Sequence, residues 1–297
     1  MFLSEKISAI YHNKVHKHSQ NNETVKKVTT LLDLGRKAIE EASKRGASYV
    51  DVRIGEILDE RLTVKKGLPE EVTFFQTTGF GVRAIVKGAW GFAGSTDLTP
   101  KEVLETTRKA VKIALASSKL KRKETMLTPT KYCCCKDKYS TPMKKDPFKI
   151  PLEEKIDTLT SAERTIAEQS NLIKSSSAFY RAFRENKLFT NSENMEVTQQ
   201  ITWCGGGLQS IAVKNGEVQR RSYPASFRGN FSTAGYEFFE SLALSEHAKE
   251  VGKESVQLLD AEKCPSTEID LILSGDQLAL QVHESCGHPT ELDRALG

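Results

Sequence analysis

The sequence predicts an α+β protein, and three kinds of pattern support this fold class. Apolar residues recur at helical spacing in several segments, alternate with polar residues in others, and short glycine-containing turns separate neighbouring strand-like runs. The chain of 297 residues is long enough for one large or two modest domains. We expect an N-terminal mixed α/β domain with hairpins, followed by the beginning of a second, β-rich domain.

The composition excludes several classes of protein. Forty-three Lys and Arg residues against 39 Asp and Glu give a net charge of +4, too small an excess to indicate nucleic-acid binding. No apolar run approaches the roughly 18 residues of a membrane-spanning helix, so we expect no membrane partner. The chain has six cysteines, and three of them, Cys133, Cys134 and Cys135, are adjacent. Neighbouring cysteines rarely bridge one another, so we expect free thiols, rather than a soft-metal site, in a reducing compartment.

Residues 1–25 are expected to form a disordered leader. This stretch has no continuous apolar core and no small-residue cleavage site, so it does not resemble a secretory signal. His12, His16 and His18 offer a metal-binding tract as an alternative, but a frayed polar leader explains them more simply. We therefore expect a cytoplasmic protein.

The N-terminal α+β domain is predicted to span residues 26–118. A helix with apolar residues at helical spacing ends at Gly46, a position typical of a helix cap. Strands follow, and Lys87-Gly88 predicts a tight hairpin turn. Thr99 and Glu102 form a capping-box pattern, with Pro100 at the first helical position of a second helix. The predicted strands cover residues 50–54, 73–77, 82–86 and 89–93.

A lysine- and proline-rich linker is predicted at residues 119–151, and a second, incomplete domain at residues 152–297. This domain begins with a helix at 152–169 and continues with strand-like sequence in which Asn215-Gly216 predicts a hairpin. A helical region at 237–260, a strand at 269–273 and a last helix opening at residues 274–276 follow. Gly205-Gly206-Gly207 lacks the context of a phosphate-binding loop and indicates close backbone packing.

The last predicted helix carries His283, Glu284 and His288, the side chains that a zinc hydrolase needs. Neutral imidazoles bind the ion, its coordinated water acquires a pKa of about 7, and a neighbouring carboxylate takes the proton of that water. On a regular helix, residues five positions apart lie about 140° apart around the axis. We therefore predict a widened or terminating turn at residues 283–288. The alternative is that the two histidines are ordinary capping or surface groups.

The sequence HESCGHPTELDR at residues 283–294 closely resembles the zinc-binding helix of the TldD/PmbA family, also called modulators of DNA gyrase. The sequence TGFGVRAIVKGAWGFA at residues 78–93 resembles the N-terminal hairpin of the same family. Residues 96–100 resemble the start of the helix that follows, and residues 142–147 resemble its linker. The resemblance extends from about Val28 to Gly297.

This resemblance implies a TldD-type zinc metallopeptidase that degrades or trims unstructured peptides and small proteins. It implies that His283 and His288 are zinc ligands and that Glu284 is the general base. It also implies a homodimer, or a heterodimer with a TldE/PmbA-like subunit that lacks the motif. Peptide selection would rest on backbone pairing along a strand edge within an enclosed cavity. Residues 152–297 would then be the beginning of the catalytic domain.

The chain ends nine residues after His288, whereas family members continue into a mostly β half that supplies a cysteine as the third zinc ligand. We therefore expect this sequence to be a fragment or a truncated form that binds zinc weakly and is inactive alone. Alternative third ligands within the chain are Cys286, Cys204, Cys264, Glu291 and Asp293. At these positions we expect free thiols and surface carboxylates instead.

Other classes of function remain as alternatives. One is a non-catalytic partner in a TldD/TldE-type complex, or a modulator of DNA gyrase. A catalytically silent partner has no need of the complete motif formed by His283, Glu284 and His288, which favours the peptidase. Nucleic-acid binding ranks lower, because aromatic residues do not alternate with the lysines of the linker. Oxidation at a two-histidine, one-carboxylate metal site also ranks lower, because Glu284 is better placed as a base than as a ligand.

Overall fold

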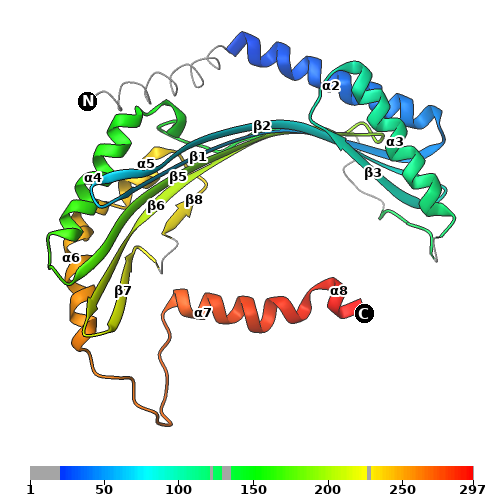
Figure 1. Cartoon of the computed structure of the whole chain (residues 1–297). Helices are drawn as coiled ribbons and strands as arrows, with labels where there is room; N and C mark the ends of the chain where they lie inside the picture. The colour runs from blue at the N-terminus through cyan, green and yellow to red at the C-terminus, as the bar shows by residue number, and fades with distance from the viewer. Residues whose placement is uncertain (1–20, 121–122, 129–134, 226–228, 297) are drawn as a thin grey trace.

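The computed structural model describes residues 21–120, 123–128, 135–225 and 229–296, in the arrangement of Figure 1. Residues 1–20 of the predicted leader, and Cys133 and Cys134, lie outside them. The first elements are α2 (Asn21–Lys44), β1 (Ala47–Lys65), β2 (Leu68–Val86), β3 (Ala89–Ser95) and α3 (Pro100–Ser118). The next are β4 (Lys136–Ser140), η2 (Pro147–Lys149), α4 (Leu152–Ala167), β5 (Ile173–Asn191), β6 (Glu196–Lys214), β7 (Glu217–Tyr223) and β8 (Asn230–Ser232). The last are α5 (Tyr236–Ser241), α6 (Leu244–Gln257), η3 (Leu258–Asp260), α7 (Gly275–Val282), η4 (His283–Gly287), η5 (His288–Thr290) and α8 (Leu292–Leu296).

One sheet of eight strands joins both halves of the chain. The strand order is β3-β2-β1-β5-β6-β4, and β7 and β8 also pair with β6. All pairs are antiparallel except β4 with β6. Strands on both sides of the expected linker meet where β1 pairs with β5, with Asp51 opposite Asn191. The sheet forms an arch in Figure 1, and its α+β character agrees with the predicted fold class.

Two hydrophobic cores lie on the same face of this sheet, one toward each end of the long strands. Val50 and Val52 of β1 belong to the core covered by α2 and α3. Leu62 and Val64 of the same strand belong to the core covered by α4, α5 and α6. These four residues share a face because alternate residues of a strand point the same way. The two helix groups accordingly lie at opposite ends of the arch (Figure 1).

The predicted turns and helix cap are confirmed. Lys87 and Gly88 have φ of +48° and +70° in the hairpin between β2 and β3. Asn215 and Gly216 have φ of +52° and +86° in the hairpin between β6 and β7. These positive values are those of a two-residue turn whose twist matches that of the strands. The hydroxyl of Thr99 accepts a hydrogen bond from the backbone N–H three residues on and caps α3.

The glycine triplet lies in β6, where other segments approach its backbone closely. A Cβ at Gly205 would lie 2.0 Å from the carbonyl oxygen of Asn230, and one at Gly206 would lie 2.2 Å from that of Phe179. A Cβ at Gly207 would also be too close to its neighbours. The prediction of close backbone packing is confirmed.

Several boundaries differ from those predicted. β2 is one continuous strand, although the sequence indicates two short runs. Its open face carries apolar residues such as Phe75, which obscure the alternation. The helical region at 237–260 divides into α5 and α6, because Ala243 adopts a left-handed conformation with φ of +47°. The expected linker at 119–151 contains β4 and the buried Phe148, so part of it packs with the body.

The strand predicted at residues 269–273 does not form. Residues 261–274 have no regular secondary structure, and no described strand pairs with them. A strand needs a neighbour to satisfy its backbone groups. Between Ala261 and Ala295 every side chain is exposed except that of His288, which is half-buried. In Figure 1 the segment that carries α7 stands apart from the arch. Within the described part of the chain, no helix has the length and apolar character needed to cross a membrane.

Candidate metal centre

The C-terminal helix changes its winding where the two histidines lie. After α7, residues His283–Gly287 form a π-helical turn and His288–Thr290 form a 3₁₀ turn. A π-helical turn contains more residues than an α-helical turn, so it brings residues five positions apart onto one face. The predicted widening of the turn at residues 283–288 is confirmed.

This turn brings the two imidazoles and one carboxylate together. The ring centroids of His283 and His288 are 4.6 Å apart and the rings are inclined at 77°. Nε2 of His288 lies 3.5 Å from Oε2 of Glu284, and Nε2 of His283 lies 4.0 Å from Oε1 of the same residue. One ligand atom from each of the three residues therefore lies within 4.8 Å of the others.

A second carboxylate contacts the other nitrogen of one imidazole. Nδ1 of His288 lies 2.7 Å from Oε1 of Glu291. When Nδ1 is protonated and donates a hydrogen bond to the carboxylate of Glu291, Nε2 is unprotonated. Its lone pair is then free to bind a metal ion. The sequence offers Glu291 only as an alternative ligand, although its position three residues after His288 is the signal for this contact. The hydroxyl of Thr290 donates to the carbonyls of Cys286 and Gly287 and completes the end of the turn.

The residues fit a zinc ion in donor type and in position. Zinc takes imidazole donors in tetrahedral geometry, with bonds of about 2.0–2.1 Å, and can leave its other positions to water. The side chains of His283 and His288 are 65% and 37% exposed, so changes of rotamer can bring both imidazoles to one ion. Two imidazoles with an adjacent carboxylate are suited to activating a metal-bound water.

None of the described cysteines belongs to this cluster. Cys286 lies within the turn, and Cys264 lies in the segment before α7; both thiols are exposed. Cys204 is buried in the body, where its Sγ donates to the carbonyl of Gly235. Burial raises the pKa of the Cys204 thiol to about 12. The part of the chain that the structure describes therefore offers no cysteine as a third ligand.

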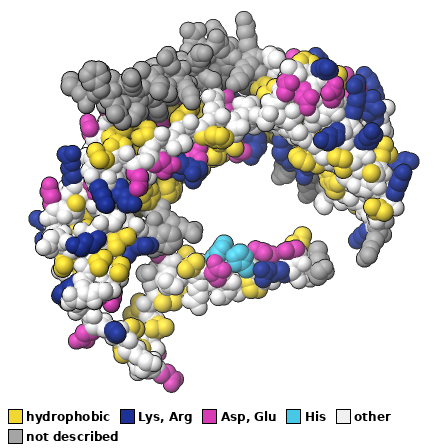
Figure 2. All heavy atoms as spheres, in the orientation of Figure 1, with side chains coloured by type: hydrophobic (Ala, Val, Ile, Leu, Met, Phe, Trp, Pro, Cys, Tyr) yellow, Lys and Arg dark blue, Asp and Glu magenta, His cyan; other side chains and the backbone are white. Residues whose placement is uncertain are grey.

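The site lies on an open surface. Figure 2 shows histidine side chains on the exposed surface of the segment that carries α7, next to acidic side chains. The resemblance implies an enclosed cavity, but the described residues form none around this cluster, because the segment is exposed along nearly its whole length. A peptide bound here would be in contact with solvent in this structure.

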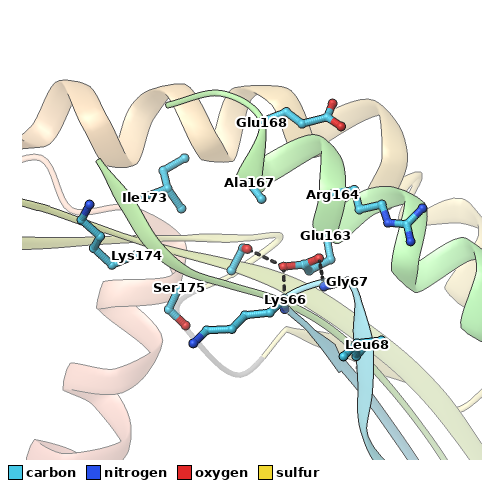
Figure 3. A pocket seen from close by; sticks show the side chains of 11 residues that line it. Lys66, Gly67, Leu68, Glu163, Arg164, Ala167, Glu168, Ile173, Lys174 and Ser175 are labelled. Carbon is cyan, nitrogen blue, oxygen red and sulfur yellow. Dashed lines mark hydrogen bonds between the residues drawn. The ribbon is translucent and has the colours of Figure 1, made fainter. Parts of the chain in front are cut away.

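A cavity of about 570 Å³ lies elsewhere, between the tip of the β1–β2 hairpin and α4 (Figure 3). Lys66, Arg164 and Lys174 line it. At its base the buried carboxylate of Glu163 accepts hydrogen bonds from two backbone N–H groups of the hairpin tip and from the hydroxyl of Ser176. Because these donors satisfy the carboxylate, its role is to hold the hairpin. No residue of the candidate metal centre lines this cavity.

Two domain models match the chain. PmbA/TldA metallopeptidase domain 1 matches residues 50–114, and the PmbA/TldA metallopeptidase central domain matches residues 145–259. Together they cover more than half of the chain and nearly all of the four long strands. Both matches end before α7, so His283, Glu284 and His288 lie outside them.

Curated relatives are metalloproteases. Metalloprotease MJ0996 of Methanocaldococcus jannaschii is 28% identical over 272 residues, which cover 92% of this chain and 55% of that protein. A metalloprotease of Methanothermobacter thermautotrophicus is 24% identical over 248 residues, covering 84% of this chain and 51% of that protein. The chain thus spans about half the length of the curated relatives it matches.

Solved structures share the fold at low sequence identity. A Thermotoga maritima protein described as a modulator of DNA gyrase has a TM-score of 0.60 and 16% identity, over 79% of this chain and 50% of that chain. TldE from Thermococcus kodakarensis has a TM-score of 0.51 and 15% identity, over 76% of this chain and 47% of that chain.

The two domain matches are to domains of a metallopeptidase family, and the named relatives agree with that family. The chain belongs to the PmbA/TldD family, as the resemblance of its motifs predicts.

Proposed function

We propose that this chain carries the metal-binding part of a zinc-dependent metallopeptidase. In this proposal His283 and His288 bind the ion and Glu284 is the general base. The observation that carries the proposal is the π-helical turn, which brings side chains five residues apart onto one face. If the two histidines were ordinary surface groups that bind no common ion, nothing would require the turn to place them on one face.

The chemistry follows from the positions of these side chains. His283 and His288 would hold the zinc ion, which when bound would supply an acidified water with a pKa of about 7 and polarise a carbonyl. The carboxylate of Glu284 would accept the proton of that water and pass it to the leaving amine. Glu291 holds Nδ1 of His288, which fixes the orientation of the ring and keeps Nε2 available.

The substrate and partner follow from the family. We propose unstructured peptides or small proteins as substrates, which the enzyme recognises through their backbone rather than through a particular side chain. We further propose a dimer, either of identical chains or with a TldE/PmbA-like subunit. The likeness to a TldE structure supports the second form. Because this chain supplies two imidazole ligands, we expect it to bind zinc weakly and to be inactive alone.

Metal titration of the purified chain tests the site. We expect one zinc per chain, loss of binding in His283→Ala and His288→Ala, and retention in Glu284→Gln, because the base is not required to hold the ion. Cys286→Ala is the matched control, since Cys286 lies in the same turn but outside the cluster. Binding that survives both histidine substitutions would contradict the assignment.

A peptidase assay with an unstructured peptide tests the activity of the chain. We expect no cleavage by residues 1–297 alone. Cleavage that a chelator and Glu284→Gln both abolish would overturn the inactivity and support the catalytic roles. The alternative, a non-catalytic partner or a modulator of DNA gyrase, has the name of the Thermotoga maritima structure in its favour. Absence of zinc binding by the wild-type chain would favour that alternative.

A further inference from the structure

The face of the sheet that points away from the two cores forms the inner side of the arch (Figure 1). On this inner face β1 presents its odd-numbered residues, because its even-numbered core residues point the other way. The sequence Asp-x-Arg occurs twice there, as Asp51 with Arg53 and as Asp59 with Arg61. The two occurrences are eight residues apart, which corresponds to about 27 Å along a strand.

The first cluster consists of Asp51, Arg53 and, from β2, Arg83. Nη1 of Arg53 donates to Oδ1 of Asp51 at 2.6 Å, and Nε and Nη2 of Arg83 donate to Oδ2 at 3.0 and 2.8 Å. The Asp51 side chain is fully buried. The guanidinium carbon of Arg53 lies 5.0 Å from the ring centroid of Phe189. That of Arg83 lies 5.1 Å from the ring centroid of Trp90.

The second cluster repeats this arrangement with Asp59, Arg61 and, from β5, Arg181. Nε and Nη2 of Arg61 donate to Oδ2 of Asp59 at 3.1 and 2.7 Å. Nε and Nη2 of Arg181 donate to its two oxygens at 2.8 and 2.7 Å. The Asp59 side chain is buried, and the guanidinium of Arg181 lies 5.0 Å from the ring centroid of Trp203. In each cluster one buried carboxylate thus binds two guanidinium groups.

Each cluster has one positive charge more than its carboxylate needs. One guanidinium compensates a buried carboxylate, and the second leaves a net charge of +1. The four arginine side chains are between 35% and 49% exposed, and a bidentate contact uses only two of the five N–H groups of a guanidinium. Of the other carboxylates on this face, Glu185 is paired with Lys187, and Glu71 faces the hydroxyl of Thr63. Both clusters therefore retain the charge and the donors to bind a further carboxylate.

The surface between the two clusters is low and open. Gly55 lies midway between Asp51 and Asp59 on β1. A Cβ at Gly55 would meet no described atom within 4 Å. An extended chain that lies along β1 can therefore approach the sheet between the clusters and reach both.

We propose that the inner face binds an extended acidic segment of polypeptide, whose carboxylates about eight residues apart contact the two arginine clusters. Guanidinium and carboxylate form charge-assisted, often bidentate, hydrogen bonds. An extended peptide rises by about 3.4 Å per residue, as β1 does, so equal spacing in sequence gives equal spacing along the strand. The aromatic rings and the buried carboxylates hold the guanidinium groups in place, so binding costs little side-chain entropy.

A single-stranded nucleic acid fits this face less well than an acidic peptide. Its phosphates follow one another at every nucleotide, whereas the excess positive charge here is confined to two separated clusters. Its bases need free aromatic faces for stacking. The ring of Trp203 is already occupied by Arg181 and stacks on Phe183, with 5.1 Å between the two ring centroids.

As a statement about substrates, this inference rests on the proposed function. Recognition through the peptide backbone does not distinguish sequences, and the inner face would add a preference for acidic ones. Binding to the inner face requires no metal, so it is measured with a chelator present. Peptide binding by a chain that binds no zinc would support this inference and contradict the proposed function. Zinc binding without peptide binding would do the reverse.

Fluorescence anisotropy of a labelled peptide tests the spacing on the intact wild-type chain. The probe is a glycine- and serine-rich peptide with two aspartates eight positions apart. We expect it to bind at least about tenfold more tightly than a peptide with the aspartates about three positions apart, because only the first reaches both clusters. We expect no binding of the same peptide with lysines in place of the aspartates. Equal affinity for the two spacings, or for aspartate and lysine, would overturn the proposal.

A double variant tests the arginines without leaving a buried charge uncompensated. Arg53→Gln/Arg61→Gln removes the excess charge of each cluster, and the remaining arginine still pairs with the carboxylate. We expect the dissociation constant of the eight-spaced peptide to rise at least about tenfold, because two charge-assisted contacts are lost. The melting temperature should stay near that of the wild-type chain.

Arg36→Gln/Arg45→Gln is the matched control. It changes the net charge by the same amount, and both arginines are ion-paired on α2, on the opposite side of the sheet. Their side chains are 48% and 47% exposed, similar to those of the clusters. We expect unchanged peptide binding. Equal weakening by the two double variants, or tighter binding of labelled oligothymidylate than of the acidic peptide, would overturn the proposal.

Discussion

The core covered by α4, α5 and α6 contains a fully buried ion pair. Nζ of Lys155 in α4 lies 2.6 Å from Oε1 of Glu60 in β1, and neither side chain is exposed. The same ammonium donates to the carbonyl of Pro147 and lies 5.2 Å from the ring centroid of Tyr180. One side chain thus joins a helix, two strands and the segment before the helix. A buried pair adds little net stability, but the loss of one member leaves an uncompensated charge in the core.

Replacement of the lysine alone should therefore destabilise the protein strongly. We expect Lys155→Met to lower the free energy of unfolding by about 3–5 kcal/mol, measured by urea denaturation. The double variant Lys155→Met/Glu60→Leu should recover most of this loss, because it removes both charges.

Lys145→Met is the control for this experiment, since Lys145 pairs with Glu240 on the surface. An exposed pair contributes about 0–1 kcal/mol, so this substitution should change stability little. If Lys155→Met and Lys145→Met lowered the free energy of unfolding equally, burial of the Lys155 pair would not explain the effect.

At the scale of elements, the tip of the β1–β2 hairpin is held from outside the hairpin. Lys66 and Gly67 have φ of +52° and +71°, and their N–H groups donate to the carboxylate of Glu163 at 2.9 and 2.7 Å. Ser176 of β5 donates to the same carboxylate at 2.5 Å. Helix α4 thereby fixes both the hairpin and the start of β5, and Glu163 also lines the cavity of Figure 3.

Loss of the carboxylate should loosen the hairpin tip. An amide at position 163 has one carbonyl oxygen in place of two, so one hydrogen-bond donor loses its acceptor. We expect Glu163→Gln to lower the free energy of unfolding by about 1–3 kcal/mol and to accelerate amide hydrogen exchange at Lys66 and Gly67. Glu168→Gln is the control, because Glu168 lines the same cavity but is exposed. Unchanged exchange at both amides would show that another contact holds the tip.

At the scale of the whole molecule, an arched body with two cores carries a C-terminal segment that buries no described side chain. The body extends through η3, where Lys214 pairs with Asp260. Beyond it, residues 261–274 are exposed and have no regular secondary structure. Such segments are the preferred sites of proteolysis, because a protease must bind its substrate in an extended conformation.

Limited proteolysis should consequently separate the candidate metal centre from the body. We expect the first cleavage within residues 261–274, and a body fragment whose melting temperature matches that of the intact chain. Mass spectrometry of the fragments identifies the site. First cleavage within the long strands, or a lowered melting temperature of the fragment, would show that the segment contributes to the fold.

The predictions that succeeded are local in sequence. The turn at Lys87-Gly88, the cap at Thr99 and the widened turn between His283 and His288 each depend on residues a few positions apart. The pairing of β1 with β5 could not be predicted, because the partners are more than a hundred residues apart and many strands have similar patterns. The predicted domain boundary at residues 119–151 therefore gave no indication that strands on both sides form one sheet. The contact between Glu163 and the hairpin was missed for the same reason.

The central position of β1 has a consequence for the time at which the protein becomes foldable. β1 ends at Lys65, but its partner β5 is complete only at Asn191. At about 5–20 residues per second, a ribosome needs roughly 6–25 s to make the chain between these two points. During that interval the nascent hairpin of β1 and β2 lacks β5, the strand that pairs with the other side of β1. The apolar side chains near the tip of the hairpin therefore have no core to pack into. The distance between the β1 and β5 codons along the messenger RNA thus sets how long each new chain must be kept from contact with neighbouring chains.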